Sequence, residues 1–378
     1  RNSMNLFIYS LKKAGGLPDC RVLLSSDSKE PTGLSRDDVR AEQMTTRGFV
    51  TSADGSSVAL RYISASGSWI YTGKRKYGPF SESWDGHDND MVFAADGKTL
   101  AYSFRDAARK ITVCRDDERF GPYEKAGRPA FIEGTRDIIY IAVTDGKTSV
   151  FINGKKTAGP FDSAALQKTT LLWGKDADPR GKRMISGEYF TATAAGKVSL
   201  YRRGEQVLGP FGAGSFAVYR TRDGDVLAFC GKGEGKKDLS VIVTKTKRYE
   251  FDRKASPCLS PEGTVLAFRF ADGDKTSIES GNTKLGPFEK FGPSFFVPSK
   301  NSYVLLCAKG GSCYLGWSTG EMTEIPHMTV ENGYWDNKLK LSPDGKIAQV
   351  TIRNKVLDTS AGNGESWLDG ELDCGNAG

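Results

Sequence analysis

Short apolar runs with alternating polar positions recur along the whole chain, and polar turns separate them at close intervals. One repeat unit contains four such runs, at Met91–Ala95, Thr99–Phe104, Ile111–Arg115 and Glu118–Tyr123. Side chains of a strand point alternately to its two faces, so runs of this length and period predict β-strands. The pattern predicts an all-β chain built from four-stranded antiparallel units, whose strands we call A to D.

The tripeptide Gly-Pro-aromatic marks the fourth strand of the unit. Proline has no amide hydrogen to donate, so at an outer edge strand it opposes pairing with another chain. We expect the following aromatic residue to pack between neighbouring units. Full copies occur at Gly78–Phe80, Gly121–Tyr123, Gly159–Phe161, Gly209–Phe211 and Gly286–Phe288, and degenerate copies occur at Tyr249–Asp252, near Ile325–Pro326 and near Gly370–Asp373.

A second marker, an acidic or polar residue before glycine, precedes an apolar alternating run in each unit. Two markers that share a period near 42 residues indicate tandem repeats, and four strands per repeat are typical of β-propeller blades. We count eight blades; seven is the alternative, because residues 338–376 fit least well. The marker stands at Asp54, Asp96, Asp223, Glu262 and Asp344, with Gly134, Gly181 and Lys300 in the remaining places.

The marker also carries a family resemblance. Ser342-Pro343-Asp344-Gly345 is similar to the Ser-Pro-Asp-Gly turn of TolB-like, WD-like bacterial β-propeller repeats, and Ser260–Gly263 matches it with glutamate in place of aspartate. Ser52–Gly55 and Ala94–Gly97 match in part. The resemblance spans residues 47–376 and implies a propeller. Such propellers serve as partner platforms, as gating domains of peptidases and occasionally as enzymes, so it implies no single function.

Residues 1–46 lie outside the regular repeat, and residues 47–378 are predicted to form the propeller, within one domain overall. Asn5–Ser10 and Arg21–Ser25 resemble strands, and residues 35–44 resemble a short capped helix. Asn5–Ser10 is a candidate for a strand that completes the last blade and closes the ring. The alternative is an N-terminal decoration packed on the rim.

Composition narrows the setting. No apolar run approaches the roughly 18–20 residues of a membrane helix, so we expect no membrane insertion. The seven cysteines show no framework spacing and no secretory signal is visible, which favours a cytoplasmic protein; export after signal removal is the alternative. Cys307 and Cys313 flank a predicted turn. They either form a disulfide, if the protein is exported, or are two small buried residues. The net charge of +7 mildly favours acidic partners.

Catalytic motifs are missing from the sequence. With two histidines, no Gly-x-Ser-x-Gly elbow, no P-loop and no paired Cys-x-x-Cys, we expect no cofactor and favour a non-enzymatic protein. The densest carboxylate segment contains Asp85, Asp88 and Asp90. Carboxylate oxygens on a tight loop suit Ca²⁺, but the EF-hand spacing is absent. The segment is therefore a weak metal candidate, and a solvated turn is the alternative.

The D–A and B–C connections vary most, and variable loops on a rigid scaffold are where recognition usually resides. The two longest D–A loops carry Trp84 and His87 in one and Tyr334 and Trp335 in the other, which would form an aromatic patch if the ring closes. The alternative is that the tryptophans cover blade ends. The same connections carry cations that either are solvated or form a basic ring, among them Arg109, Lys125, Arg128, Arg253 and Lys290.

These observations leave three functions open. The favoured one is a scaffold that binds a protein or peptide, acidic ones included, on the D–A/B–C face through the aromatic and basic residues named above. The second is a carbohydrate-active or hydrolytic propeller that uses Asp85, Asp88 and Glu289 at the channel mouth. The third is a nucleic-acid-binding scaffold, which we do not favour because aromatic residues are not interleaved with the basic loops.

Overall fold

The computed structural model of the chain consists of β-strands and their connections, with no α-helix among the residues that it describes. Strands close in sequence pair into antiparallel sheets, mostly of four strands. The predicted fold class, an all-β chain of β-propeller type with four-stranded antiparallel blades, is confirmed. The number of blades and the closure of a ring remain predictions. The described residues are 9–14, 17–22, 45–53, 55–64, 67–72, 75–80, 91–172, 183–233, 235, 237–297, 301–329, 338–341, 348–352, 355–358 and 368–370.

The chain divides into two compact units, which we describe one at a time. Unit 1 comprises Arg1–Leu166, Ile185–Ala195 and Leu200–Val207, and unit 2 comprises Gln167–Met184, Gly196–Ser199 and Leu208–Gly378. Four strands have residues in both units: β16 (Ser163–Leu171), β17 (Arg183–Ala194), β18 (Lys197–Arg202) and β19 (Glu205–Phe211).

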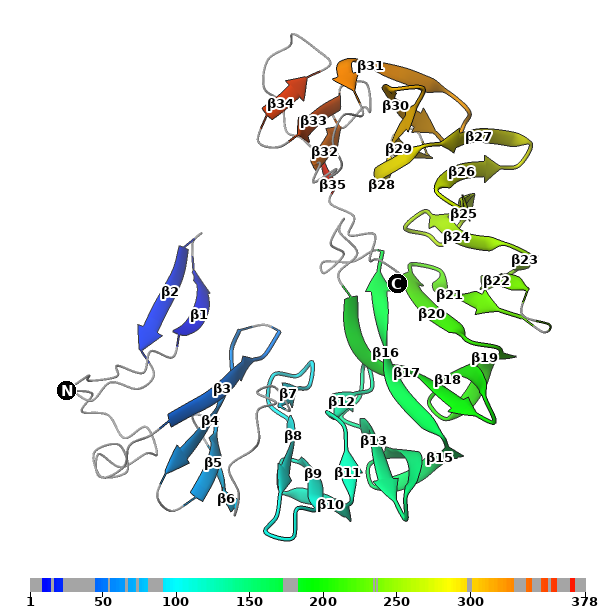
Figure 1. The fold of residues 1–378 in the computed structure, drawn as a ribbon. Coiled ribbons are helices and arrows are strands. Elements are labelled where there is room, and N and C mark those ends of the chain that lie inside the picture. The colour runs from blue at the N-terminus through cyan, green and yellow to red at the C-terminus, as the bar shows by residue number, and fades with distance from the viewer. Residues whose placement is uncertain are drawn as a thin grey trace. The chain divides into compact units, whose positions relative to one another are not determined.

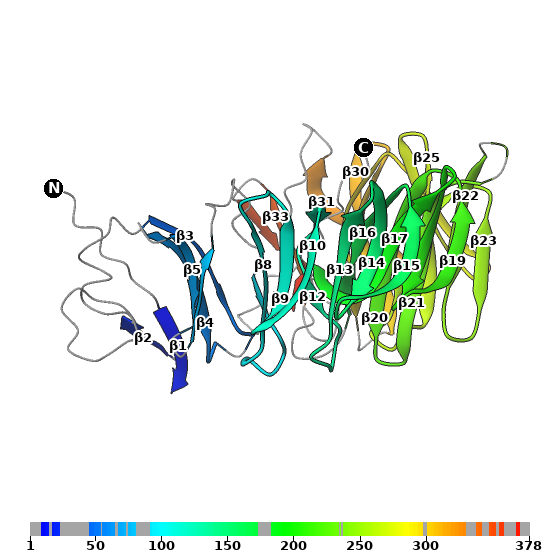
Figure 2. The ribbon, with the colours of Figure 1, turned by 90° about the horizontal axis from the view of Figure 1, so that it is seen from below.

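Unit 1 begins with a hairpin, continues with two four-stranded blades, and then has a blade whose strand A is split in two. In the second blade, strands β8, β9 and β10 run side by side (Figure 2). The strands are β1 (Tyr9–Ala14), β2 (Leu17–Val22), β3 (Thr45–Thr51), β4 (Val58–Ser64), β5 (Gly67–Tyr71), β6 (Lys76–Phe80), β7 (Val92–Phe93), β8 (Leu100–Arg105), β9 (Ile111–Arg115), β10 (Glu118–Tyr123), β11 (Lys125–Ala126), β12 (Ala130–Phe131), β13 (Ile138–Thr144), β14 (Lys147–Ile152) and β15 (Lys155–Phe161).

Unit 2 repeats the same plan, and its blades follow one another in chain order (Figure 1). Thr169–Leu171 of β16 also pair in parallel with Val218–Arg220 of β20. The strands are β20 (Gly214–Thr221), β21 (Gly224–Lys232), β22 (Asp238–Val243), β23 (Arg248–Phe251), β24 (Lys254–Leu259), β25 (Val265–Asp272), β26 (Lys275–Ser280), β27 (Thr283–Phe288), β28 (Lys290–Val297), β29 (Ser302–Lys309), β30 (Ser312–Trp317), β31 (Met322–Thr329), β32 (Lys338–Leu341), β33 (Ala348–Ile352), β34 (Lys355–Asp358) and β35 (Leu368–Gly370).

Four of the five Gly-Pro copies form a bulge in a strand D for which the strand register is described, and all five of these peptide bonds are cis. In β10, Phe120 pairs with Val113 and Tyr123 pairs with Ile111, so two residues of β10 oppose one residue of β9. Gly121 has φ 112°, and a Cβ there would lie 3.0 Å from the Ile111 carbonyl oxygen. Only glycine combines this backbone conformation with so close an approach. The same shift of register occurs in β6, β15 and β27.

The aromatic residue after Gly-Pro packs against the next blade, as predicted. Phe80 is buried among Met91, Leu100 and Tyr102 of the following blade. Further along unit 1, Tyr123 joins the cluster that contains Tyr140. The aromatic residue of the repeat marker thus supplies a packing contact between its own blade and the next. Equivalent ring contacts are Phe161–Phe190 in unit 1, and Phe211–Phe229 and Phe251–Phe270 in unit 2.

The predicted turns occur where the markers stand. Asn153 and Gly154 both have positive φ, 47° and 78°, as a two-residue hairpin turn of the mirror-image type requires. At the A–B turn, Asp96 accepts hydrogen bonds from the amides of Lys98 and Thr99 at 2.8 and 3.0 Å. In this blade the acidic residue of the second marker therefore closes its own turn.

Two features differ from the repeat or lie outside the described residues. In the last sheet, β35 pairs with β32 and not with β34, so its fourth strand lies at the opposite edge from that of the other blades. At the N-terminus, β1 shares only Tyr9 and Ser10 with the strand predicted at Asn5–Ser10, whose other residues lie outside the described residues, and the partner of β1 is β2. The predicted helix at residues 35–44 lies outside the described residues, so the role of residues 1–46 stays a prediction.

Candidate functional site

The aromatic part of the predicted site cannot be placed. Trp84, His87, Tyr334 and Trp335 lie outside the described residues, together with the carboxylate segment at residues 85–90. Among the residues that the structure describes, no three His, Cys, Asp or Glu side chains are grouped so as to hold a metal ion.

The predicted cations are all described; Arg109 and Arg253 lie on connections, Lys125 and Lys290 begin strands A, and Arg128 lies between the two halves of a split strand A. Arg109 is on the B–C connection between β8 and β9. Lys125 and Arg128 follow β10 in unit 1, while Arg253 precedes β24 and Lys290 begins β28 in unit 2. Arg109 and Arg128 are exposed parts of unit 1, and Lys125 is exposed at the first position of its strand.

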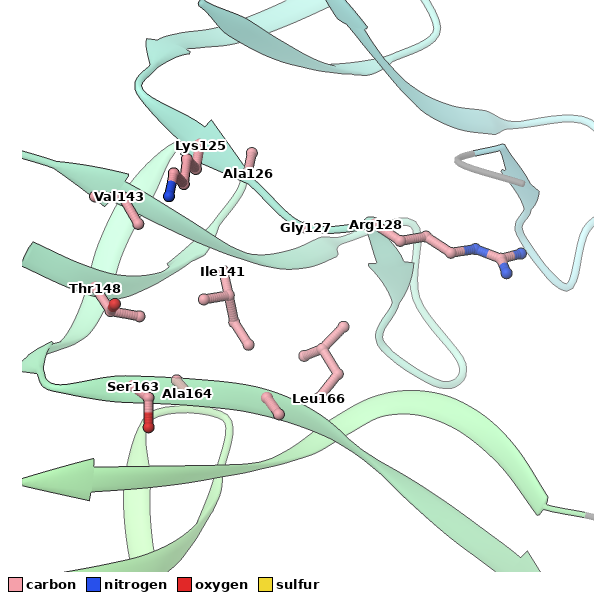
Figure 3. A pocket seen from close by; sticks show the side chains of 11 residues that line it. Lys125, Ala126, Gly127, Arg128, Ile141, Val143, Thr148, Ser163, Ala164 and Leu166 are labelled. Atoms are coloured by element: carbon pink, nitrogen blue, oxygen red, sulfur yellow. The ribbon is translucent and has the colours of Figure 1, made fainter. Parts of the chain in front are cut away.

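A pocket of about 510 Å³ opens beside Lys125 in unit 1 (Figure 3). Its walls come from β11, β13, β14 and β16, and most of the side chains that line it are apolar. Lys125, Val143, Thr148 and Ser163 stand where these strands meet the D–A and B–C connections, so the pocket belongs to the predicted binding face. The other lining residues are Ala126, Gly127, Arg128, Ile141, Ala164, Ala165 and Leu166.

The two cations of this pocket differ in what they contact. The Arg128 guanidinium donates a hydrogen bond to the Met91 carbonyl oxygen at 3.1 Å and points away from Ile141 (Figure 3). Lys125 makes no ion pair in the part of unit 1 that the structure describes. Arg128 therefore holds the start of the second blade, and Lys125 is the cation at the pocket entrance that remains open to a ligand.

The cations of unit 2 are engaged within the fold. The Arg253 guanidinium carbon lies 3.5 Å from the centre of the Phe270 ring, and the same side chain is 2.7 Å from Glu279. Burial tends to raise the pKa of Glu279, but hydrogen bonds from Lys284 and Arg253 outweigh it and lower that pKa. Arg253 thus covers an aromatic ring and neutralises a carboxylate, which are structural roles. Burial raises the pKa of the Cys313 thiol, and the positive charge of Lys290 partly offsets that rise.

Carboxylates on the D–A connections cap the next blade, a role that sequence reasoning missed. Asp162 donates its amide to the Thr193 carbonyl oxygen and accepts the Ala195 amide on its side chain, both at 2.9 Å. Glu124 does the same with Val143 and Gly146, and Glu289 does so with Ala308 and Gly310. The signal was an acidic residue directly after the Gly-Pro-aromatic tripeptide. Glu289, a candidate for hydrolytic chemistry, therefore has a structural partner.

A second cavity, also of about 510 Å³, lies on the opposite, A–B/C–D side of unit 1. Arg115 is one of its lining residues. The guanidinium nitrogens of Arg115 lie 2.5 Å from the Glu118 carboxylate, 2.9 Å from the Asn153 amide oxygen and 3.5 Å from the Asp137 carboxylate. Arg136 pairs with Asp96 at 2.9 Å in the same region. These charges neutralise one another across two consecutive blades. The residues that line the cavity therefore have a structural role, which is to hold the two blades together.

Five cysteines are free thiols: Cys114, Cys230, Cys258, Cys307 and Cys313. Cys307 and Cys313 are both fully buried and free, which fits the reading as two small buried residues. Burial raises the pKa of Cys307 to about 12, which leaves its thiol protonated and unreactive at neutral pH. No cysteine chemistry is therefore assigned to this pair.

Comparison with known proteins gives no family. No protein-family model matches the chain, and no curated protein matches it. Similar solved structures are TolB from Acinetobacter baumannii (14% identity, TM-score 0.26, 59% of this chain and 57% of that chain), the β-propeller domain of the Trilobed protease from Pyrococcus furiosus (11%, 0.25, 83% and 93%) and the Dos1 propeller (12%, 0.31, 81% and 91%). The chain thus spans little more than half of that TolB, and TM-scores this low carry no argument about function. In the described part of the chain, no helix has the length and apolar character to cross a membrane.

Proposed function

We propose that this chain is a non-enzymatic β-propeller scaffold that binds a protein or peptide partner on its D–A/B–C face. The observation that carries the proposal is the pocket beside Lys125. It is concave and mainly apolar, it lies at the ends of strands held rigidly by their blades, and its charged lining residues are both cations. Concave apolar sites with a few fixed polar groups are the usual form of ligand sites on rigid scaffolds.

Two observations favour a scaffold over the hydrolytic alternative. Hydrolysis of a glycosidic bond needs two carboxyl groups within roughly 5–10 Å of each other and open to substrate. On the described part of this face, Glu124, Asp162 and Glu289 instead each accept a backbone amide of the following blade. No carboxylate is among the residues that line the pocket beside Lys125.

The test is selection of partners followed by mapping of the bound face. Random short peptides displayed on phage are selected on the wild-type protein, and an enriched peptide is footprinted by hydrogen–deuterium exchange. We expect slower exchange at residues 124–128, 144–148 and 162–166. Protection of the opposite turns at residues 96–98 and 153–155 instead, or failure to enrich any peptide, contradicts the proposal.

The predicted aromatic patch is tested in the same experiment. A Trp84→Ala/Trp335→Ala variant whose circular dichroism matches that of the wild type is compared for binding of the enriched peptides. Loss of binding assigns part of the site to this patch, since truncating buried aromatic anchors removes much of the binding energy. Unchanged binding restricts the site to the basic and apolar residues of the described face.

A further inference from the structure

The pocket beside Lys125 exists because the strands that form it carry small residues. Ala126 and Gly127 line one wall, and Ala164 and Ala165 line the other. The aromatic rings of this joint, Phe161 and Phe190, have centres 6.3 Å apart and are not among the residues that line the pocket. A volume of about 510 Å³ lies within the range of roughly 300–1,000 Å³ that is usual for ligand pockets.

The apolar wall of this pocket continues into the core of unit 1. Ile141, Ala164 and Leu166 line the pocket and also pack against the buried cluster that contains Val150 and Phe190. In Figure 3, the Ile141 and Leu166 side chains lie in the space between β13 and β16. Apolar surface gains free energy when it leaves water, so the group best suited to this wall is an aliphatic side chain.

The entrance selects for negative charge. The two charged residues that line the pocket are cations, and Arg128 is already bound to the Met91 carbonyl oxygen. Thr148 adds a hydroxyl group to the lining. The neighbouring carboxylate of Glu124 accepts the Gly146 amide at 3.3 Å, so it is occupied by the B–C turn. An ammonium group at the edge of an apolar pocket favours a ligand whose carboxylate lies beside its apolar group.

From these three observations we infer that the pocket bounded by Lys125, Ile141, Val143, Ser163 and Leu166 binds an extended acidic peptide. One aliphatic side chain of the peptide enters the pocket, and an Asp or Glu within two positions of it pairs with the Lys125 ammonium. Side chains of an extended peptide alternate between two sides, so neighbouring positions can reach the wall and the rim at once. This inference rests on the proposed function and names the chemical class of its partner.

The inference is tested with the peptides enriched on the wild-type protein, whose affinity is measured by fluorescence polarisation. Lys125→Glu reverses the charge at the entrance, and Thr148→Trp places a ring in the pocket from a partly exposed lining position opposite Val143. Lys155→Glu is the matched control, because it makes the same charge change on the C–D side of the same blade. All variants are checked by circular dichroism and thermal unfolding.

We expect enriched peptides to carry an aliphatic residue next to Asp or Glu. We expect both pocket variants to weaken binding about tenfold or more, and Lys155→Glu to change it less than about twofold. Replacing the acidic residue of the peptide by lysine should weaken binding to the wild type and restore it on Lys125→Glu. This exchange of charges would not arise from a general effect on folding.

The other outcomes separate the inference from the proposed function. Peptides that footprint on the D–A/B–C face but bind Lys125→Glu and Thr148→Trp as well as the wild type overturn the inference and leave the scaffold intact. Enriched peptides without acidic residues also overturn it. Failure to enrich any peptide removes both. Binding of phosphate or oligonucleotide in place of peptides, lost in Lys125→Glu, would assign the cation to a different ligand class.

Discussion

The hydroxyl oxygens of Tyr123 and Tyr140 lie 2.7 Å apart in a buried contact between two consecutive blades of unit 1. Tyr123 ends the Gly-Pro-aromatic marker of one blade, and Tyr140 lies on strand B of the next. Either hydroxyl group can be the donor in this contact. The repeat marker is thus tied to strand B of the following blade.

Removing either hydroxyl group should destabilise the protein. Tyr123→Phe and Tyr140→Phe each leave one buried hydroxyl without its partner, and we expect each to lower the free energy of unfolding by about 1 kcal/mol. Urea unfolding followed by tryptophan fluorescence measures both. No effect of either substitution would mean that the hydroxyl contact contributes less than the ring packing around it.

Glycine in the Gly-Pro bulge should be irreplaceable. Gly121→Ala puts a Cβ 3.0 Å from the Ile111 carbonyl oxygen at φ 112°, so we expect a loss of about 2 kcal/mol or more. Gly146→Ala is the control: its φ is also positive, 68°, but a Cβ there meets no atom within 4 Å. We expect this control to lose about 1 kcal/mol. If the two variants unfold at the same urea concentration, crowding at the bulge is unimportant.

The fold was predictable because its signals are local and repeated. The Gly-Pro-aromatic tripeptide and the Asp-Gly turn each specify a backbone conformation within a few residues, and their shared period gives the blade. The strands predicted at Ile111–Arg115 and Glu118–Tyr123 are found with the same bounds. The bulge was not predicted, because the sequence shows that proline cannot donate but not how the partner strand shifts its register around Gly121.

The site was predictable only in part, because side-chain partners depend on three-dimensional neighbours. Arg128 and Arg253 were expected as surface cations, yet the first donates to the Met91 carbonyl oxygen and the second covers the Phe270 ring. These partners are 37 and 17 positions away in sequence, so a local sequence pattern could not predict the contacts. The pocket beside Lys125 depends on small residues of two different strands, which composition alone does not bring together.

The carboxylate caps between blades should contribute to stability. Asp162→Ala removes the acceptor of the Ala195 amide, a contact of 2.9 Å, and we expect a loss of about 1 kcal/mol. Asp252 stands at the corresponding D–A position of unit 2 and is exposed. Asp252→Ala should change the free energy of unfolding by less than about 0.5 kcal/mol. Chemical denaturation of both variants decides; a larger loss for Asp252→Ala would contradict the capping role.

The buried thiols should resist alkylation. Burial raises the pKa of Cys307 to about 12, and Cys313 is equally inaccessible. In native protein treated with iodoacetamide at pH 8, we expect both to stay unmodified while the partly exposed Cys230 reacts. Peptide mapping by mass spectrometry measures the extent of labelling, and protein unfolded in urea is the positive control. Rapid native labelling of Cys307, or a disulfide to Cys313, would contradict the structure.

Asp96 should make stability depend on pH in acid. Burial tends to raise the pKa of its carboxyl, but hydrogen bonds from the Thr99 and Lys98 amides and the Thr99 hydroxyl, with the Arg136 charge, lower it from 3.8 to about 2. Because the folded-state pKa is the lower one, the stabilisation is complete above about pH 4 and is lost as the pH falls toward 2. Asp96→Asn should therefore cost about 1–2 kcal/mol at pH 7.

The gap between wild type and Asp96→Asn should shrink between pH 4 and pH 2, since protonation removes the same charge that the substitution removes. Thermal unfolding at pH 7, 4 and 2.5 measures it. Asp145→Asn, at an exposed B–C turn, is the control and should differ from the wild type by less than about 0.5 kcal/mol. The prediction is contradicted if the difference between wild type and Asp96→Asn stays constant down to pH 2.5. The substitution would then act by changing the hydrogen-bond geometry of the turn and not by removing the carboxylate charge.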